Sequence, residues 1–361
     1  MTAAQFNFSA GPSTLPTSVL EEIRDELVDY QRTGMSLIEM SHRGSHYTAV
    51  HTEATSLARE VFSAPDDFDV LLLQGGATLQ FSMVPMNLLG VGMRGGYVVS
   101  GSWGKKALAD GRMYGDVYPA WDGEVDGFKH MPRSGEIDLQ PDTRYLHITS
   151  NETIGGIQMY EWPDLGVPLV ADMSSDYMSR SIPWEWFDVV YGGAQKNLGP
   201  SGVTIVFVRK SALETTNRKL GAYLRYDVHA AGDSLYNTPP VFSIWMVGKV
   251  LRWLSAQGGV GAMELASDRK SRILYDAIAA SEGFYRSPVE SENRSQMNVV
   301  FRLPTEDFEA EFIATSADAG LVGLKGHRSV GGCRASIYNA MPIEGVKTLA
   351  EFMAQFQADR T

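Results

Sequence analysis

Short apolar runs alternate with helix-like patterns over most of this chain, from about residue 16 to about residue 256. Clear examples of the apolar runs are 69–73, 186–191 and 203–208, which are rich in branched and aromatic side chains. Strands that are buried on both faces have this composition, and helices that connect such strands are the usual crossovers of a parallel sheet. The sequence therefore predicts an α/β fold in which a mostly parallel sheet is sandwiched by helices.

The pattern changes after a glycine-rich cluster at 257–261. A long amphipathic helix is expected over 262–282, a second helix is expected to open at Thr305, and strands are expected over 296–303 and 333–338. These elements suit a smaller α+β domain.

We therefore divide the chain into an N-terminal segment (1–15), a large domain (16–256) and a small C-terminal domain (257–361). A length of 361 residues agrees with about two domains. The composition, 44% hydrophobic and 20% charged, is that of an ordinary globular protein and is sufficient for a sizeable buried sheet.

Lys196 lies in a glycine-rich turn, residues 191–202, between two of the expected strands. Tyr191 is the only other ionisable side chain in that turn. Removal of water from an amine lowers its pKa and makes it a nucleophile toward carbonyl carbon atoms. The turn alone is equally compatible with a lysine whose side chain extends from a loop into solvent.

Asp172 ends an apolar run at 166–172, so it would stand at a strand end adjacent to the turn that carries Lys196. Aspartate is rare in strands, and its position needs a reason. If Lys196 carries an aldehyde cofactor as a Schiff base, an ionised Asp172 facing a pyridine nitrogen would keep that nitrogen protonated and make the ring an electron sink. In the structural alternative, Asp172 caps the segment that follows it.

A glycine turn joins the strand expected at 69–73 to an apolar helix. The backbone N–H groups at the start of a helix are unpaired and lie at the positive end of its dipole. A phosphate could therefore bind to Gly76, Ala77 and Thr78 without a basic side chain. The turn is not a Walker A loop, because it lacks the lysine that such a loop has after its second glycine.

Two more strand ends carry a residue that could bind a ligand. Trp103 follows the run that starts at Tyr97, and Thr153 follows the run that starts at Tyr145. Trp103 could stack on a planar ring and Thr153 could hydrogen-bond a ring substituent, although packing in a core and capping of a turn are the structural alternatives. Together the strand ends favour a ligand crevice, because open parallel sheets bind ligands outside the carboxyl ends of their strands.

Six segments, in this order along the chain, resemble the phosphoserine aminotransferases, which are class-V, fold-type I enzymes that depend on pyridoxal 5'-phosphate. The segments are 7–12, 41–43, 75–83, 171–175, 193–197 and 326–342. The resemblance extends from residue 7 to the C-terminus, and the last segment is the most specific to the family. It implies that the large domain binds the cofactor.

The resemblance also implies a role for each strand end. Lys196 would bind pyridoxal 5'-phosphate covalently, Asp172 would face the pyridine nitrogen and Trp103 would stack on the ring, while Thr153 would lie near the ring hydroxyl. The cofactor phosphate would be bound by Gly76, Ala77, Thr78 and Gln195, and by Asn237 and Thr238 from the neighbouring subunit. This sharing requires a homodimer with shared active sites. Some relatives have a third glycine where this chain has Ala77, which leaves the fine geometry of the phosphate site open.

The family transfers the amino group of L-glutamate to 3-phosphohydroxypyruvate, which gives O-phospho-L-serine and 2-oxoglutarate in serine biosynthesis. The resemblance implies this reaction here, as a ping-pong cycle in which the freed Lys196 moves the proton between substrate and cofactor. The sequence leaves open whether the chain also acts on the phosphorylated hydroxythreonine of pyridoxine biosynthesis.

The keto acid carries a carboxylate and a phosphate, and the planar fork of arginine suits both groups. By resemblance, Arg334 would bind the α-carboxylate, and His327 with Arg328 would bind the phosphate or the side-chain carboxylate of glutamate. His42 and Arg43 would reach in from the other subunit. Taken alone, these two segments are also compatible with solvated polar loops.

Three other functions share part of this pattern. An aminotransferase of the alanine-glyoxylate kind would use the same lysine and aspartate but would not need the second set of anion-binding side chains. A cysteine desulfurase would need a mobile catalytic cysteine, and Cys333 lies in a strand-like run instead. A non-catalytic α/β binding protein would leave Lys196 with a structural role only.

Charge and cysteine content limit the remaining classes. A net charge of -12 and a pI near 5.1 argue against nucleic acid or an anionic membrane as a partner. The seven histidines form no metal-binding motif, so no metal is expected. Cys333 is the only cysteine, which rules out an intramolecular disulfide and suits a reducing cytoplasm. No signal-peptide pattern is present, and the apolar run at 241–254 is too short and too charged to span a membrane.

Overall fold

The structure is a computed structural model that describes residues 5–213 and 219–360. Its centre is a seven-stranded sheet with the order β2–β10–β9–β8–β5–β3–β4. The strands are β2 (Phe68–Leu73), β3 (Arg94–Val99), β4 (Asp116–Asp122), β5 (Thr143–Thr149), β8 (Leu169–Asp172), β9 (Phe187–Gly193) and β10 (Thr204–Arg209). Only β10 is antiparallel to its neighbours, so the predicted mostly parallel sheet is confirmed.

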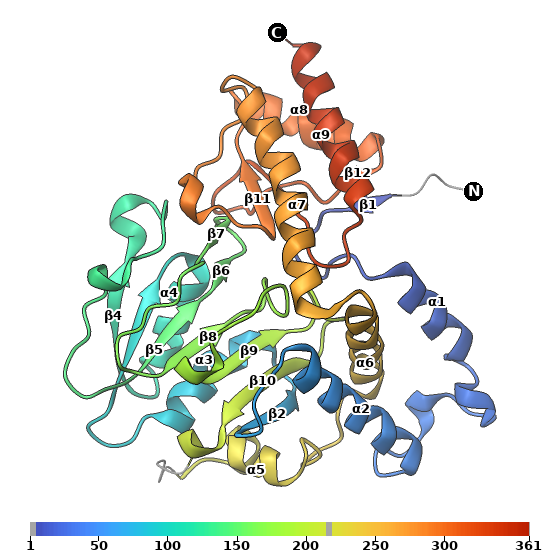
Figure 1. Ribbon diagram of the computed structural model, residues 1–361, viewed down its shortest axis with the longest axis vertical. Helices are drawn as coiled ribbons and strands as arrows, with labels where there is room; N and C mark the ends of the chain where they lie inside the picture. The colour runs from blue at the N-terminus through green and yellow to red at the C-terminus, as the bar shows by residue number, and fades with distance from the viewer. Residues whose placement is uncertain (1–4, 214–218, 361) are drawn as a thin grey trace.

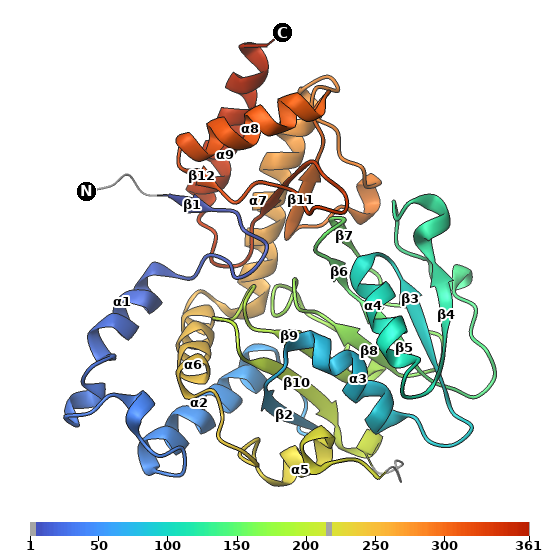
Figure 2. The same cartoon turned by 180° about the vertical axis from the view of Figure 1, so that it is seen from behind.

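Helices cover both faces of this sheet (Figures 1 and 2). One core cluster joins α2 (Ser45–Val61) and α6 (Val241–Ala256) to one face. A second cluster joins α3 (Gly76–Leu88), α4 (Ser102–Gly111) and α5 (Tyr226–Ala231) to the other. Side chains along β8 alternate between the two clusters, as a strand buried on both faces requires. The predicted sandwich by helices is therefore confirmed.

A separate core cluster lies in the C-terminal part of the chain. It surrounds the antiparallel pair of β11 (Asn298–Phe301) and β13 (Cys333–Ser336). The helices around this pair are α7 (Gly259–Ala280), α8 (Glu306–Asp318) and α9 (Ile343–Ala358). The predicted elements are confirmed with slightly different bounds, and Thr305 caps α8 by accepting a hydrogen bond of 3.2 Å from the N–H of Phe308.

The N-terminal end of the chain joins this C-terminal part. Strand β1 (Phe6–Asn7) pairs in parallel with β12 (Leu321–Val322), and the two lie beside α9 in Figure 1. Helix α1 (Thr17–Glu26) then leads back toward α6, on which it packs. Val260 and Met263 of α7 contribute to the core under the sheet, so hydrophobic packing continues across residue 257. The domain boundary at that residue stays a prediction.

The parallel strands of the sheet place their carboxyl ends along one edge. The residues that follow β2, β3, β5, β8 and β9 therefore meet there. After β5 the chain forms a small hairpin of β6 (Asn151–Glu152) and β7 (Ile157–Gln158), which rises from this edge toward β11 (Figure 1).

Candidate active site

A cavity of about 110 Å³ lies at the carboxyl edge of the sheet. It is lined by Gly76, Ala77, Thr78, Trp103, Thr149, Asn151, Thr153, Asp172, Ser174, Ser175, Gln195 and Lys196. Eight of these are residues that the sequence predicted to bind a cofactor. The structure thus brings together side chains from five strand ends that are far apart in the sequence.

Lys196 reaches this cavity from a tight turn after β9. The turn is closed by hydrogen bonds from the N–H of Ala194 to the carbonyl of Val203 (2.9 Å) and from the N–H of Leu198 to the carbonyl of Ala194 (3.0 Å). Nζ of Lys196 donates a hydrogen bond of 2.6 Å to Oγ1 of Thr153. Burial lowers the pKa of Lys196 to about 8, although the nearby carboxylate of Asp172 opposes that shift. The amine therefore titrates close to neutral pH.

Asp172 ends β8 and is buried at the wall of the cavity. Its Oδ1 atom accepts hydrogen bonds from the N–H (2.9 Å) and the hydroxyl (2.6 Å) of Ser174, so the capping role is present. Within the described part of the chain, no donor is hydrogen-bonded to Oδ2. Burial raises the pKa of Asp172, while Ser174 and Lys196 lower it. One oxygen is thus held in place and the other is free to meet a ligand cation or N–H group.

The turn before α3 has the geometry of an anion site. Gly75 adopts a left-handed conformation (φ 90°), and the first helical hydrogen bond runs from the N–H of Leu79 to the carbonyl of Gly75 (3.3 Å). The N–H groups of Gly76, Ala77 and Thr78 precede that bond and point out of the helix end. All three residues line the cavity.

Trp103 is held at the start of α4 by a residue that the sequence analysis missed. Both oxygens of Glu152 accept backbone hydrogen bonds there, from the N–H of Trp103 (3.1 Å) and of Gly104 (2.8 Å). Burial raises the pKa of Glu152 to about 7, and the two N–H groups oppose the shift. The available signal was a carboxylate directly before Thr153 at a strand end.

The indole of Trp103 lies over the lysine. Nζ of Lys196 is 5.8 Å from its ring centroid. Its buried Nε1 atom has no hydrogen-bond partner among the residues that the structure describes. The cavity thus combines an indole, an unpaired helix end, a free carboxylate oxygen and an amine. These groups fit a planar heterocyclic aldehyde that carries a phosphate.

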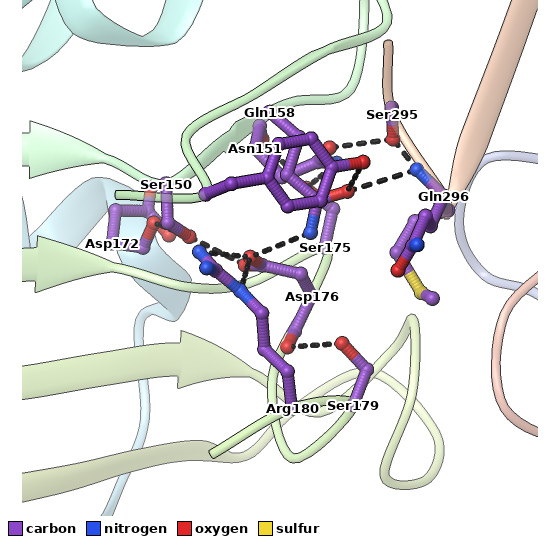
Figure 3. Close-up of polar contacts among 12 residues, drawn as sticks. Ser150, Asn151, Gln158, Asp172, Ser175, Asp176, Ser179, Arg180, Ser295 and Gln296 are labelled. Atoms are coloured by element: carbon purple, nitrogen blue, oxygen red, sulfur yellow. Dashed lines mark hydrogen bonds and ion pairs between the residues drawn. The ribbon is translucent and has the colours of Figure 1, made fainter. Parts of the chain in front are cut away.

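A buried polar network supports Asp172 from behind (Figure 3). The hydroxyl of Ser150 donates to the carbonyl of Asp172 (3.1 Å) and to the carboxylate of Asp176. Asp176 is also bound by Nε of Arg180 (3.1 Å) and by Nε2 of Gln158 (3.3 Å). Because the charge of Asp176 is neutralised by Arg180, it can lie close to Asp172 without an unpaired buried charge.

Arg334 connects the C-terminal part of the chain to the cavity. From β13, its Nη1 donates a hydrogen bond of 3.0 Å to the carbonyl of Thr153. Its Nε is buried and lacks a partner within residues 5–213 and 219–360. Burial lowers the pKa of His327, and the nearby charges of Arg334, Arg328 and Lys106 lower it further.

Four predicted residues lie away from the cavity of their own chain. His42 and Arg43 form the turn before α2, and Asn237 and Thr238 lie before α6. The carbonyl of Thr238 accepts a hydrogen bond of 3.4 Å from Nε2 of Gln74, the residue before the glycine turn. His327, Arg328 and Arg334 are also outside the cavity lining. The roles given to these residues stay predictions.

Two further properties concern metals and membranes. No group of three or more His, Cys, Asp or Glu side chains that could hold a metal ion occurs in the described residues. Among the helices described, none combines the length and the apolar character needed to cross a membrane.

Comparisons with known proteins agree on one family. A model of the family described as aminotransferase class-V matches residues 5–349. The phosphoserine aminotransferase of Lysinibacillus sphaericus is 48% identical over 358 residues, 99% of each chain. The solved structure of phosphoserine aminotransferase from Bacillus circulans subsp. alkalophilus has a TM-score of 0.97 at 49% identity and covers 100% of both chains. The PLP-bound enzyme of Trichomonas vaginalis has a TM-score of 0.93 at 34% identity, covering 97% of this chain and 99% of its own.

Proposed function

This chain belongs to the class-V aminotransferases and, within them, to the phosphoserine aminotransferases, and we propose that Lys196, Asp172 and Arg334 carry its reaction. It is a transaminase that uses pyridoxal 5'-phosphate. The proposed reaction takes the amino group of L-glutamate and gives it to 3-phosphohydroxypyruvate, with O-phospho-L-serine and 2-oxoglutarate as products.

The observation that carries this assignment is the shared cavity of Lys196, Asp172 and the helix end at Gly76–Thr78. When bound, pyridoxal 5'-phosphate supplies an electron-accepting ring to the carbon that gives up its proton. We assign the phosphate to the N–H groups of Gly76, Ala77 and Thr78, with Gln195 beside them. With Oδ1 of Asp172 bound by Ser174, the other oxygen would be available to keep the pyridine nitrogen of the cofactor protonated.

Lys196 is assigned two tasks, covalent attachment of the cofactor and transfer of the α-proton through Nζ. A general acid–base group works best when its pKa lies near the working pH, and burial brings that of Lys196 to about 8. Thr153 orients Nζ through the 2.6 Å hydrogen bond. Trp103 closes one side of the cavity and excludes water from the amine.

We assign substrate binding to basic side chains. Arg334 binds the α-carboxylate, and the hydrogen bond from its Nη1 to the carbonyl of Thr153 fixes its guanidinium next to Lys196. His327 and Arg328 bind the phosphate of the keto acid or the side-chain carboxylate of glutamate. His42 and Arg43 act from the partner subunit, which explains why they lie away from the cavity of their own chain.

The remaining assignments follow from the same proposal. The protein works as a homodimer in which Asn237 and Thr238 reach the cofactor phosphate of the neighbouring subunit. It acts in the cytoplasm in serine biosynthesis. Action on 4-phosphohydroxythreonine in pyridoxine biosynthesis is a second candidate, because that substrate carries the same phosphate group. Residues 16–256 form the cofactor-binding domain and 257–361 the smaller one.

A coupled assay tests this function. The purified protein is incubated with L-glutamate and 3-phosphohydroxypyruvate, and 2-oxoglutarate is followed with glutamate dehydrogenase. We expect turnover that depends on both substrates. The value of kcat/KM should be at least tenfold lower when hydroxypyruvate replaces the phosphorylated acid. Equal kcat/KM values for the two acids would remove the phosphate-binding assignment and leave a general aminotransferase.

A further inference from the structure

Residues 326–332, here called the clamp loop, form a closed turn that carries His327 and Arg328. The N–H of Gly326 donates to the carbonyl of Gly332 (2.9 Å), which closes the neck of the loop. The N–H groups of Val330 and Gly331 both donate to the carbonyl of His327 (3.0 and 2.9 Å). A side chain at Gly326 would place its Cβ 2.1 Å from the carbonyl oxygen of Gly331, so the neck closes only with glycine there.

The clamp loop rests on an ion pair that lies outside the catalytic cavity. Arg302, which follows β11, contacts Glu309 of α8 with 2.5 Å between Nε and Oε1. Oε2 of Glu309 accepts a hydrogen bond of 3.1 Å from the N–H of Gly332. Nη1 of Arg302 donates one of 3.0 Å to the carbonyl of Val330. The pair thus binds the returning limb of the loop at two points.

Glu309 is buried, and the loop backbone packs closely on Arg302. The side chain of Glu309 is only 8% exposed, so both of its oxygens need partners, and Arg302 and Gly332 provide them. A Cβ at Gly332 would lie 2.6 Å from Cδ of Arg302, which shows how closely the loop backbone approaches the guanidinium stem.

The charges on the loop explain why a support is needed. The cations of Arg334, Arg328 and Lys106 all lie near enough to His327 to lower its pKa, so three positive charges gather around this residue. Like charges gathered at one place repel one another and favour an open loop when no anion is bound. The hydrogen bonds from Glu309 and Arg302 oppose that opening, because they are made to the backbone and do not occupy the anion-binding side chains.

We propose that the Arg302–Glu309 pair determines specificity for the second anionic group of the substrate by holding the clamp loop in its binding conformation. The inference rests on the proposed roles of His327 and Arg328. Arg302 and Glu309 are positioning residues, since their contacts run to the backbone of the loop, to each other and, for Oε1 of Glu309, to the N–H of Leu303 (3.4 Å).

Glu309→Gln tests the proposal, since it keeps the shape of the side chain but removes its charge and one of its acceptors. Asp307→Asn is the matched control, because it removes one negative charge from an exposed position in the same turn of α8. We expect Glu309→Gln to raise KM for 3-phosphohydroxypyruvate about tenfold, with kcat and the visible cofactor spectrum unchanged. KM for hydroxypyruvate, which lacks the second anion, should stay within about twofold. Asp307→Asn should match the wild type throughout.

Hydrogen exchange provides a readout that does not depend on activity. In the holoenzyme, amides of 326–332 should exchange about tenfold faster in Glu309→Gln than in Asp307→Asn.

Arg302→Lys serves as a second variant should Glu309→Gln fail to fold. It keeps a cation beside Glu309 but loses the bond to Val330, so it should give a smaller change of the same kind. Equal KM increases for both keto acids, or unchanged loop exchange, would overturn the proposal.

Arg328→Leu, measured in parallel, separates this inference from the function on which it rests. Loss of phosphate preference in Arg328→Leu together with wild-type behaviour of Glu309→Gln would remove only the role of the ion pair. Retained preference in Arg328→Leu would contradict the assignment of the clamp loop itself.

Discussion

Nζ of Lys196, in the turn after β9, lies 2.6 Å from Oγ1 of Thr153, in the turn of the β6–β7 hairpin. The carbonyl of the same threonine accepts the hydrogen bond from Arg334. Thr153 therefore fixes the distance between the amine proposed to move the proton and the guanidinium proposed to bind the substrate carboxylate.

Thr153→Val should lower kcat about tenfold, because it removes the hydroxyl that orients Nζ but keeps the shape and the backbone carbonyl. Thr153→Ser restores the hydroxyl and should recover most of the loss. Steady-state kinetics with glutamate and 3-phosphohydroxypyruvate give both values. If Thr153→Ser is as slow as Thr153→Val, the hydroxyl alone does not position Nζ, and a wild-type kcat in Thr153→Val would contradict the role of the hydrogen bond.

Asp172→Asn should reduce kcat on the order of 100- to 1000-fold, because the amide retains an acceptor for Ser174 but cannot stabilise a cation at the free oxygen. The melting temperature of the cofactor-free protein should fall little, since the cap is kept. Activity close to that of the wild type would show that the carboxylate has only its capping role.

Glu152 makes a pH-dependent contribution to stability. Its pKa in the folded protein is about 7, above the ordinary value of 4.5, so the folded state binds the proton more tightly. The wild type should therefore lose stability as the pH rises from about 4.5 to about 7. The Glu152→Gln variant lacks the titrating carboxyl group and should not show this loss. The free energy of unfolding of the wild type, relative to the variant, should fall by about 3 kcal/mol across that window.

Urea unfolding of the cofactor-free proteins at several pH values measures this difference. Glu161→Gln, at an exposed position, is the control. A wild-type-to-Glu152→Gln difference that stays constant with pH would show that the carboxyl group does not titrate in this range.

Mixed dimers test the sharing of active sites. Lys196→Ala and Arg43→Ala chains should each be nearly inactive alone. If Arg43 acts on the partner's site, a heterodimer contains one intact site, and co-expression at equal levels should restore about a quarter of wild-type activity. Absence of any recovery, with heterodimers verified by two affinity tags, would place Arg43 in its own subunit's site, and an active Arg43→Ala chain would place it outside the reaction.

The sequence predicted the sheet, its covering helices and the meeting of the strand ends, because strand periodicity and glycine turns are local signals. The position of Asp172 shows a limit of such signals, since the capping and ligand-facing alternatives are both realised, one on each oxygen. Glu152 was missed because its partners are backbone N–H groups 48 and 49 residues away, and no local pattern marks such contacts. Glu309 was missed because its link to the clamp loop is likewise a backbone N–H group, 23 residues away.

His42, Arg43, Asn237 and Thr238 show a different limit. Their predicted roles depend on a second copy of the chain, and in one chain they lie away from the cavity. The packing of α7 against the core of the large sheet was also not predicted, because the apolar pattern of a helix does not show which of two cores the helix packs against.

Covalent attachment of the cofactor to Lys196 is the central claim, and reduction with borohydride tests it most directly. The holoenzyme is reduced, digested and analysed by mass spectrometry for a lysine that carries the reduced cofactor. We predict a single modified peptide with the label on Lys196, and no label in the Lys196→Ala protein after the same treatment. A label on another lysine, or a label that persists in Lys196→Ala, would contradict the assignment.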